Sequence, residues 1–543
     1  MNYHKILLIV IGFVFALPAL PVSNNAHAIL YYRLDLFESA NKLLQQKLLS
    51  SGATNDDKAE ACFYLGNIAL KTQKADSAGY YFSKAKEFEP GSPYAFIGDG
   101  ILVLSKDKKQ AEAYFDEALS GKNKKDPFIA IVVARAYFDN NTNDYQEMVS
   151  EMKDKYDKLP DIYILEGDIM CHQQKYGEAS SLYEQAIYFD PKCEEAYLKY
   201  ARVYENLNPD LALDMLQKLL AISPNSEIAY LQMADIAFNK GDFTMAADNY
   251  NKYLSTGIES SPHDITRYTT ILFYNKEYDK AMKYIDEGLA ADPNNMVMHR
   301  LKMYINGNRN ELNTEQAEAF MKKFPESEYI PLDYIFYGRM LKESKNYAQA
   351  CSQFEKALKM DPSKTEIYKD LAETYELTND YKQAIESYRQ FFSGNSQEAA
   401  PSDYLAYGQV YYFAANALKG TPDSVYQKTY LTKADSLFTI VTDKSPNNCL
   451  GYFWRARALS FIDYETTQGL AKPFYEKVLT ILEPEGKDKK KIIECYSYLG
   501  FYYYVATDYQ NSLTYWNKAL VIDPENEVAK RAIAGINEQM KKK

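Results

Sequence analysis

The sequence is poor in the residues on which most acid–base catalysis and metal binding depend. Only five of its 543 residues are histidine, and His4 and His27 both lie near the N-terminus. The motifs His-Glu-x-x-His, Cys-x-x-Cys, Gly-x-x-x-x-Gly-Lys and Gly-x-Ser-x-Gly are all absent. Zinc, phosphate-loop and hydrolase chemistry therefore lack their minimal ligands or nucleophile. We expect no enzyme activity, no metal and no cofactor.

Long hydrophobic runs are absent after residue 20, so we expect no stable membrane insertion of the body of the chain. The N-terminus carries Lys5, then an apolar run over 6–20, then a small-x-small sequence that ends at Ala28. This order is typical of a secretory signal peptide, here residues 1–28. An uncleaved anchor is the alternative, although a run of about 15 residues is short for crossing a bilayer. We therefore predict an exported chain, periplasmic or secreted.

An excess of positive charge is also absent. The 62 Lys and Arg residues against 74 Asp and Glu residues leave a net charge of -12, which disfavours nucleic acid as a partner. Tyrosine is the abundant residue, with 50 copies. Because a tyrosine ring suits both half-buried helix faces and binding grooves, this count does not distinguish packing from recognition.

A fixed spacing recurs along the chain: a glycine, an alanine 12 residues later, an aromatic residue 4 later, an alanine 3 later and a proline 5 later. Three segments keep it in full: Gly66, Ala78, Phe82, Ala85 and Pro90; Gly167, Ala179, Tyr183, Ala186 and Pro191; Gly338, Ala350, Phe354, Ala357 and Pro362. A fourth follows it with Ser512 in the first alanine position: Gly500, Trp516, Ala519 and Pro524. Such a recurrence predicts a repeat of helix pairs.

Two packed helices give this spacing a physical reason. A small residue lets the two backbones approach where the helices cross, and the aromatic residue of the second helix fills the space between turns. The proline ends the second helix because it lacks an amide hydrogen. At such crossings we expect leucine at Gly338 to loosen the array more than alanine at Gly167, because a methyl group often fits where a leucine side chain does not.

The spacing resembles the tetratricopeptide repeat, whose period is about 34 residues. The resemblance implies an all-α fold, a right-handed α-solenoid of antiparallel helix pairs. It also implies the following organisation: a helical lead-in over 29–58, about ten units over 59–400 with degenerate units at 127–159 and 294–326, about three further units over 401–526 with an insertion near 412–433, and a capping helix over 527–543.

Helical geometry places a second stripe of first-helix residues beside the packing anchors. In the tetratricopeptide family this stripe lines the inner groove. Here it holds Phe63, Ile164, Leu198, Leu231, Phe238, Ile335, Phe501 and Tyr504. These residues are candidates for contact with a protein or peptide partner, or they pack against the neighbouring unit as core. The subclass that captures a C-terminal carboxylate has a lysine where Phe63 stands, so we do not expect capture of a chain end.

Taken with the missing chemistry, the resemblance implies a non-catalytic scaffold for protein–protein interaction. Glycan binding by stacking on tyrosine rings in the groove is the alternative, motivated by the tyrosine count.

Overall fold

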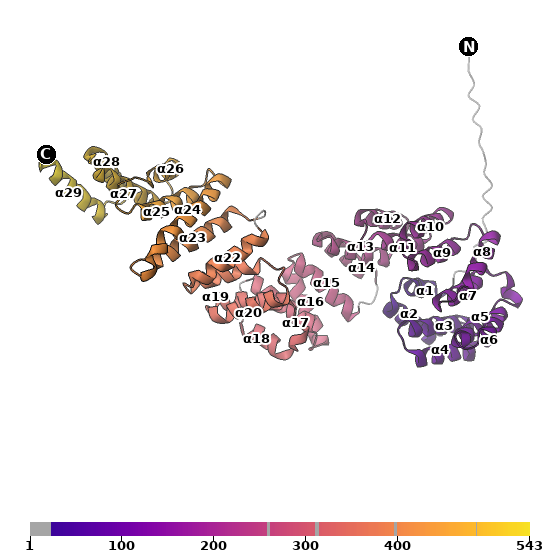
Figure 1. The fold of residues 1–543 in the computed structure, drawn as a ribbon. Coiled ribbons are helices and arrows are strands. Elements are labelled where there is room, and N and C mark those ends of the chain that lie inside the picture. Colours follow the sequence, from indigo (N-terminus) through magenta and orange to yellow (C-terminus); the bar gives the residue numbers. More distant parts are fainter. Residues whose placement is uncertain (1–22, 258–260, 310–313, 396–398, 485, 543) are drawn as a thin grey trace, which may run out of the picture. The chain divides into compact units, whose positions relative to one another are not determined.

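The computed structural model describes residues 23–257, 261–309, 314–395, 399–484 and 486–542. The apolar run over 6–20 lies outside these ranges. Within them the chain is helical without any strand, and the predicted all-α solenoid of antiparallel helix pairs is confirmed. The chain divides into two compact units, residues 1–277 (unit 1) and 278–543 (unit 2). Figure 1 shows the helices of each unit packed beside their neighbours in sequence order.

The helices of the two units are as follows. Unit 1 contains α1 (Ala26–Arg33), α2 (Phe37–Leu49), α3 (Asn55–Lys71), α4 (Ala75–Phe88), α5 (Pro93–Leu104), α6 (Lys108–Ala118), α7 (Pro127–Asp139), α8 (Tyr145–Lys155), α9 (Pro160–His172), α10 (Tyr176–Phe189), α11 (Glu194–Tyr204), α12 (Pro209–Ile222), α13 (Glu227–Asn239), α14 (Phe243–Ser255) and α15 (Pro262–Tyr274). Unit 2 contains α16 (Tyr278–Ala291), α17 (Met296–Asn308), α18 (Thr314–Lys323), α19 (Pro331–Glu343), α20 (Tyr347–Met360), α21 (Ile367–Leu377), α22 (Tyr381–Asn395), α23 (Pro401–Ala417), α24 (Gln427–Lys444), α25 (Cys449–Ile462), α26 (Lys472–Leu482), α27 (Lys489–Val505), α28 (Tyr509–Ile522) and α29 (Glu527–Lys542). Short 3-10 helices span Gly121–Lys125, Glu326–Glu328 and Pro422–Tyr426.

Odd-numbered helices up to α27 are the first helices of the pairs, and even-numbered helices are the second helices. The glycine of a first helix faces the aromatic ring of its second helix. An added Cβ would stand 2.4 Å from the Phe82 ring at Gly66, 2.4 Å from the Tyr183 ring at Gly167 and 2.7 Å from the Phe354 ring at Gly338. A methyl group therefore does not fit at Gly167 unless the ring moves, so alanine at this position also costs stability.

The other anchors take the positions that the spacing predicts. The alanines and aromatic residues are buried: Ala78, Phe82, Ala85, Ala179, Tyr183, Ala186, Ala350, Phe354, Ala357, Trp516 and Ala519. The prolines are exposed in the turn that follows each second helix: Pro90, Pro191, Pro362 and Pro524. In the four pairs that follow the spacing, the turn between the helices holds one residue of left-handed backbone seven positions after the glycine, as at Gln73 (φ 60°) and Gln174 (φ 59°).

Several expected boundaries differ in detail. The segment 29–58 is not a separate lead-in, because α1 and α2 form a helix pair of their own that packs on α3. The units at 127–159 and 294–326 keep both helices, as α7 with α8 and α17 with α18. The extra residues near 412–433 lengthen α23 and α24 and form the 3-10 helix between them. The contacts divide the chain after Glu277, within the stretch 59–400 that was predicted as an array of about ten repeats. The final helix is present as α29.

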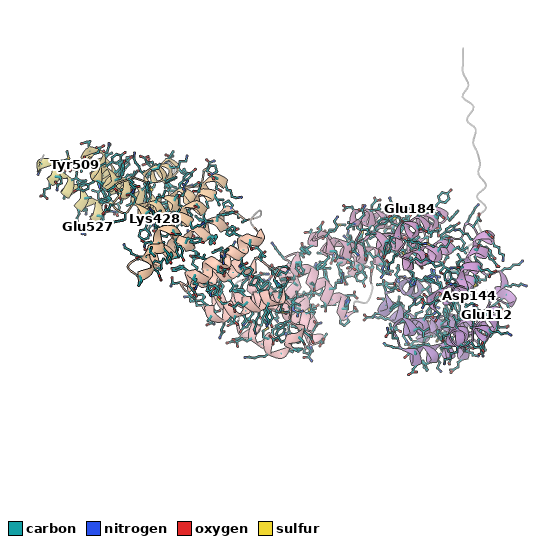
Figure 2. The ribbon with its side chains drawn as sticks, in the orientation of Figure 1. Glu112, Asp144, Glu184, Lys428, Tyr509 and Glu527 are labelled. Carbon is teal, nitrogen blue, oxygen red and sulfur yellow. The ribbon has the colours of Figure 1, made fainter. Side chains whose placement is uncertain are left out.

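Charged residues on the second helices also form ion pairs between neighbouring helix pairs. Lys108, at the start of α6, lies 2.7 Å from Asp144, which precedes α8, and 3.9 Å from Glu112. Glu112 and Asp144 accordingly lie close together in Figure 2. Because these side chains are largely exposed, such pairs contribute little to stability.

Candidate functional site

In unit 1, helix α1 lies on the first-helix face and borders two cavities. A cavity of about 550 Å³, called the α7 cavity below, is lined by Tyr32 and Arg33 of α1 with residues of α3, α7, α9 and α11. A second cavity of about 850 Å³ is lined by His27 and Tyr31 of α1 with residues of α2, α13, α14 and α15. The first helices and α1 therefore line two hollows on this face, each partly open to solvent.

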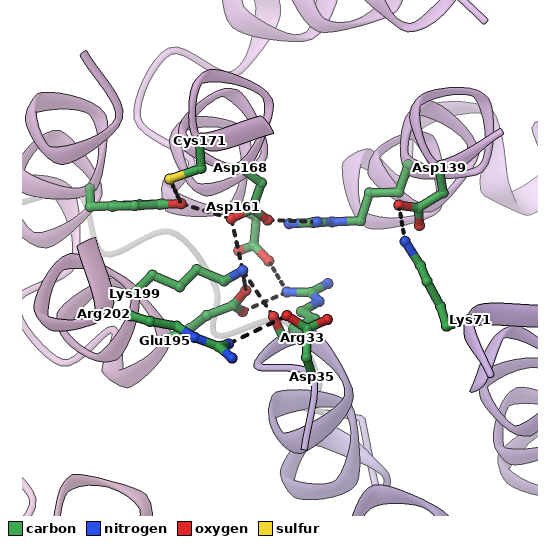
Figure 3. A network of polar contacts seen from close by, with 12 residues as sticks. Arg33, Asp35, Lys71, Asp139, Asp161, Asp168, Cys171, Glu195, Lys199 and Arg202 are labelled. Atoms are coloured by element: carbon green, nitrogen blue, oxygen red, sulfur yellow. Dashed lines mark hydrogen bonds and ion pairs between the residues drawn. The ribbon is translucent and has the colours of Figure 1, made fainter. Parts of the chain in front are cut away.

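The C-terminal end of α1 is fixed by charged groups from distant parts of the sequence. The Nη1 atom of Arg33 donates to Asp161 Oδ1 at 3.2 Å and to Glu195 Oε2 at 2.9 Å. Lys199 Nζ donates to the backbone carbonyl of Arg33 at 3.0 Å, and Arg202 Nη1 donates to that of Leu34 at 2.7 Å. Figure 3 shows these bonds converging on the end of the helix. They attach α1 to α9 and α11.

The N-terminal end of α1 is fixed as well. Ser23 Oγ and Asn25 Nδ2 donate to Glu60 Oε2 of α3 at 2.5 and 2.8 Å, and His27 Nε2 lies 2.9 Å from Glu227 Oε1 of α13. The predicted cleavage point after Ala28 thus lies inside a helix, at a buried residue. Cleavage there would remove the contacts of residues 23–27 with α3 and α13.

Asp168 is the centre of the polar network beside the α7 cavity. Its carboxylate accepts hydrogen bonds from Arg135 Nη1 at 2.8 Å, Lys199 Nζ at 2.7 Å and the Tyr183 hydroxyl at 2.9 Å. Burial alone raises the pKa of a carboxyl, but Lys199 and Arg135 outweigh it and lower the pKa of Asp168 to about 2. Asp168 is therefore ionised at neutral pH and holds α7, α9 and α11 together.

A ladder of ion pairs joins successive first helices in unit 2. Arg300 of α17 donates to Asp333 of α19 at 2.8 Å, and Arg339 of α19 to Asp370 of α21 at 2.8 Å. The ladder continues with Lys342 to Glu373, Lys369 to Asp403, and Arg457 of α25 to Glu494 of α27. The carboxylates of Asp333, Asp370 and Asp403 are buried. This part of the face is thus lined by charges that are already paired.

Neither the ladder nor α1 was predicted from the sequence. The ladder partners lie 31–37 residues apart, close to the repeat period, so a search for opposite charges at that distance would have found them. For α1, the spacing rule itself gives the signal, since Ala40 follows Ala28 by 12 residues and Leu44 stands where the aromatic residue is expected. Because Ala28 is also the last residue of the predicted signal peptide, the spacing between Ala28 and Ala40 was not recognised as a helix pair.

The candidate groove residues fall into three groups. Phe63, Ile164, Leu198 and Ile335 are buried, so the packing alternative describes them, although Phe63 also lines the α7 cavity. Leu231 and Phe238 are half-buried, and Leu231 lines the 850 Å³ cavity. Phe501 and Tyr504 of α27 are exposed, at 43% and 36%. The members of the predicted stripe therefore differ in exposure, and Phe501 and Tyr504 are the two that are exposed.

Much of the tyrosine content belongs to the core. Tyr183, Tyr250, Tyr268 and Tyr388 are among the largest fully buried side chains. Among the described residues, no group of three or more His, Cys, Asp and Glu side chains could hold a metal ion. No helix in the described ranges has both the length and the apolar character that a membrane span requires.

Comparison with known proteins gives the following relatives. The human mitochondrial import receptor subunit TOM70 is 23% identical over 212 residues, which cover 36% of this chain and 34% of that protein. The Hsp70-Hsp90 organizing protein of Triticum aestivum is 29% identical over 196 residues, or 34% of this chain and 28% of that protein. The chain thus spans about a third of the length of the curated relatives that it matches.

Among solved structures, the C-terminal part of a TPR repeat-containing protein from Cytophaga hutchinsonii is 25% identical, with a TM-score of 0.42 over 49% of this chain and 99% of that chain. The family models that match are tetratricopeptide repeats, at residues 25–93, 195–226 and 341–390. The first of them begins at Asn25 and includes both α1 and α2. Three separate segments of this chain therefore match tetratricopeptide repeat models, and two of them, 25–93 and 341–390, contain second-helix anchors of the predicted spacing.

Proposed function

We propose that this chain is a non-catalytic, exported scaffold that holds a protein or peptide partner on its first-helix face. The observation that carries the proposal is the pair Phe501 and Tyr504, the two exposed members of the predicted groove stripe. They lie three positions apart on α27 and so point to the same side of the helix. Clustered aromatic side chains that lose water on association supply most of the affinity in interfaces of this kind.

The neighbouring charges support a contact of this type. Glu494, on the same stripe of α27, is bound by Arg457 through two hydrogen bonds of 2.7 and 2.6 Å. A charge that is already paired offers little to an ionic partner, so we expect an apolar anchor of the partner to provide the main contact. Two of the curated relatives are named as a mitochondrial import receptor subunit and as an Hsp70-Hsp90 organizing protein. Those names describe proteins that act on other proteins, which favours the proposal.

Export is part of the proposal, with a changed position of cleavage. The contacts of Ser23, Asn25 and His27 with α3 and α13 favour a mature chain that retains Ser23. The intact mass of the protein from its native host decides the point. A mass that corresponds to a chain without the apolar run, but with Ser23 still present, supports export with α1 intact. A chain that begins at Ile29 restores the original cleavage position, and a chain that retains Met1 contradicts cleavage.

The experiment for partner binding compares two double variants of the mature chain. Phe501→Ala/Tyr504→Ala removes the aromatic pair from α27. Val425→Ala/Tyr426→Ala removes two side chains of unit 2 that are also exposed, at 74% and 56%, but lie in the 3-10 helix before α24. The binding constant of the partner recovered from the native host is then measured with each purified variant.

We expect the first variant to weaken binding at least about tenfold, which corresponds to about 1.4 kcal/mol, and the second to bind like the unaltered chain. Both should unfold at the same temperature as the parent. Equal loss in the two variants, or no loss in either, contradicts the assignment of the site. Recovery of a glycan ligand with no protein partner contradicts the proposed function.

A further inference from the structure

The first helices α23 and α25 carry a group of half-buried aromatic side chains, called the α23 patch below: Tyr412, Phe413, Trp454 and Phe461. The centre of the Tyr412 ring lies 5.3 Å from that of Trp454 and 6.2 Å from that of Phe461. The centres of the Phe413 and Trp454 rings are 5.8 Å apart. Aromatic side chains that pack together and still reach solvent are enriched at protein interfaces.

The α23 patch continues the stripe that carries the aromatic pair of α27. Tyr412 stands four positions after the glycine of α23, Gly408. Tyr504 stands four positions after the glycine of α27, Gly500. Gly408 lies at a helix crossing as Gly500 does, since an added Cβ there would stand 2.4 Å from the Phe438 ring. The partner-binding stripe proposed at α27 therefore has an aromatic continuation toward α23.

On the side of α21, the α23 patch borders an open hollow of about 600 Å³ that Phe413 also lines, called the acidic hollow below. Three acids line this hollow: Glu343, Glu373 and Glu376. Among the described residues that line it, Lys342 is the one cation, and its Nζ atom lies 2.8 Å from Glu373. Glu376 forms no ion pair within the described part of the chain. Burial and then the charge of Glu373 raise the pKa of the Glu376 carboxyl.

Elsewhere in unit 2, a carboxylate beside an aromatic ring binds an arginine. The Arg457 guanidinium lies 5.0 Å from the centre of the Trp454 ring and donates to Glu494 at 2.7 and 2.6 Å. A planar guanidinium can lie over a ring and bind a carboxylate at the same time. Glu376 and Phe413 offer these two partners, and no arginine among the described residues lines their hollow.

We propose that the α23 patch and the acidic hollow bind an arginine-containing segment of the protein partner. The guanidinium of the partner lies over Phe413 and donates to Glu376. Apolar side chains next to that arginine pack on the rest of the α23 patch. The net charge of -12 favours the approach of a basic segment. This inference rests on the proposed function and adds to it the chemistry of the partner.

The test selects short random peptides by phage display on the purified full mature chain. A parallel selection uses Glu376→Lys, which reverses the charge in the acidic hollow. The control selection uses Asp443→Lys, which reverses an exposed charge of the same unit on α24, outside the hollow. A peptide from the first selection is then synthesised with arginine and with citrulline, which keeps the shape of arginine and lacks its charge. Calorimetric titration measures both peptides with the unaltered chain, with Glu376→Gln and with Asp443→Asn.

We expect arginine next to apolar residues to be enriched on the unaltered chain and on Asp443→Lys, and not on Glu376→Lys. The arginine peptide should bind with one site per chain. Citrulline in the peptide and Glu376→Gln in the chain should each weaken binding at least about threefold, whereas Asp443→Asn should leave it unchanged. In the unaltered chain the bound peptide should slow hydrogen exchange in α21 and α23, a readout that stands even if a variant fails to fold.

Recovery of the same peptides on all three chains, equal loss in the two neutralised variants, or selection of peptides without arginine each overturns the inference. Failure to retain any peptide overturns it too. Because the peptides take the place of the native partner, the two proposals can fail separately. A native partner that depends on Phe501 and Tyr504 but gains nothing from Glu376 supports the proposed function and overturns this inference.

Discussion

Replacement of Gly167 by alanine tests the packing of the helix pairs most sharply. The new methyl carbon would stand 2.4, 2.8 and 2.9 Å from three carbon atoms of the Tyr183 ring, where about 3.5–4 Å is the favourable separation. The ring has little freedom to withdraw, because Tyr183 is 2% exposed and its hydroxyl donates to Asp168. Overpacking of this size costs about 1–3 kcal/mol.

The matched control is Gly177→Ala on α10, the other helix of the same pair. An added Cβ at Gly177 meets nothing within 4 Å, so alanine there should stabilise the helix by about 0.5–1 kcal/mol. The two variants should therefore differ by about 1.5–4 kcal/mol in their free energies of unfolding. Urea unfolding measures this difference, and hydrogen exchange in α9 and α10 shows whether the loss is local. Equal stability of the two variants would refute the crossing assigned to Gly167.

Three further predictions concern single side chains. Leu198→Ala should lower the free energy of unfolding by about 2–5 kcal/mol because Leu198 is fully buried, whereas Phe501→Ala should leave it nearly unchanged; denaturant titration compares them. Because the folded pKa of Asp168 is lowered from 3.8 to about 2, this carboxylate stabilises the fold above its unfolded pKa and the gain, about 2 kcal/mol, disappears as the pH falls toward 2. Melting curves at several pH values should show a smaller loss on acidification in Asp168→Asn than in the parent, and a parallel loss in both would count against this role. Gln174→Gly should raise the free energy of unfolding by up to about 1 kcal/mol, because left-handed backbone with a φ of 59° favours glycine. A lower melting temperature in this variant would contradict the prediction that Gln174 is strained.

Local spacing made the helix pairs predictable from the sequence. The contacts between Gly66 and Phe82, or between Gly338 and Phe354, join residues 16 positions apart on two adjacent helices. Side-chain size and helical periodicity therefore suffice to predict them. The prolines that end the second helices follow from the same local reasoning.

The site was less predictable because its contacts join distant segments. Arg33 meets Glu195 across 162 positions, and Tyr31 meets Glu227 across 196. These distances follow from how far the stacked helices of unit 1 curve back toward α1, which depends on many small crossing angles and not on any local motif. Phe501 is exposed and Leu198 is buried although both belong to the predicted stripe. The exposure of each residue depends on which side chains the neighbouring helix pairs place beside it, and a local motif does not give this.

The most direct test of the scaffold proposal is site-specific photo-crosslinking in the native host. A photoreactive amino acid is placed at Phe501 in one strain and, as the control, at Tyr188 in another, a position of α10 that is 80% exposed. The products are identified by mass spectrometry. We predict that one defined protein is crosslinked at position 501 and is not crosslinked at position 188. Crosslinking of the same proteins at both positions, or of none at position 501 in a folded and exported chain, would contradict the claim that the first-helix face of α27 holds a protein partner.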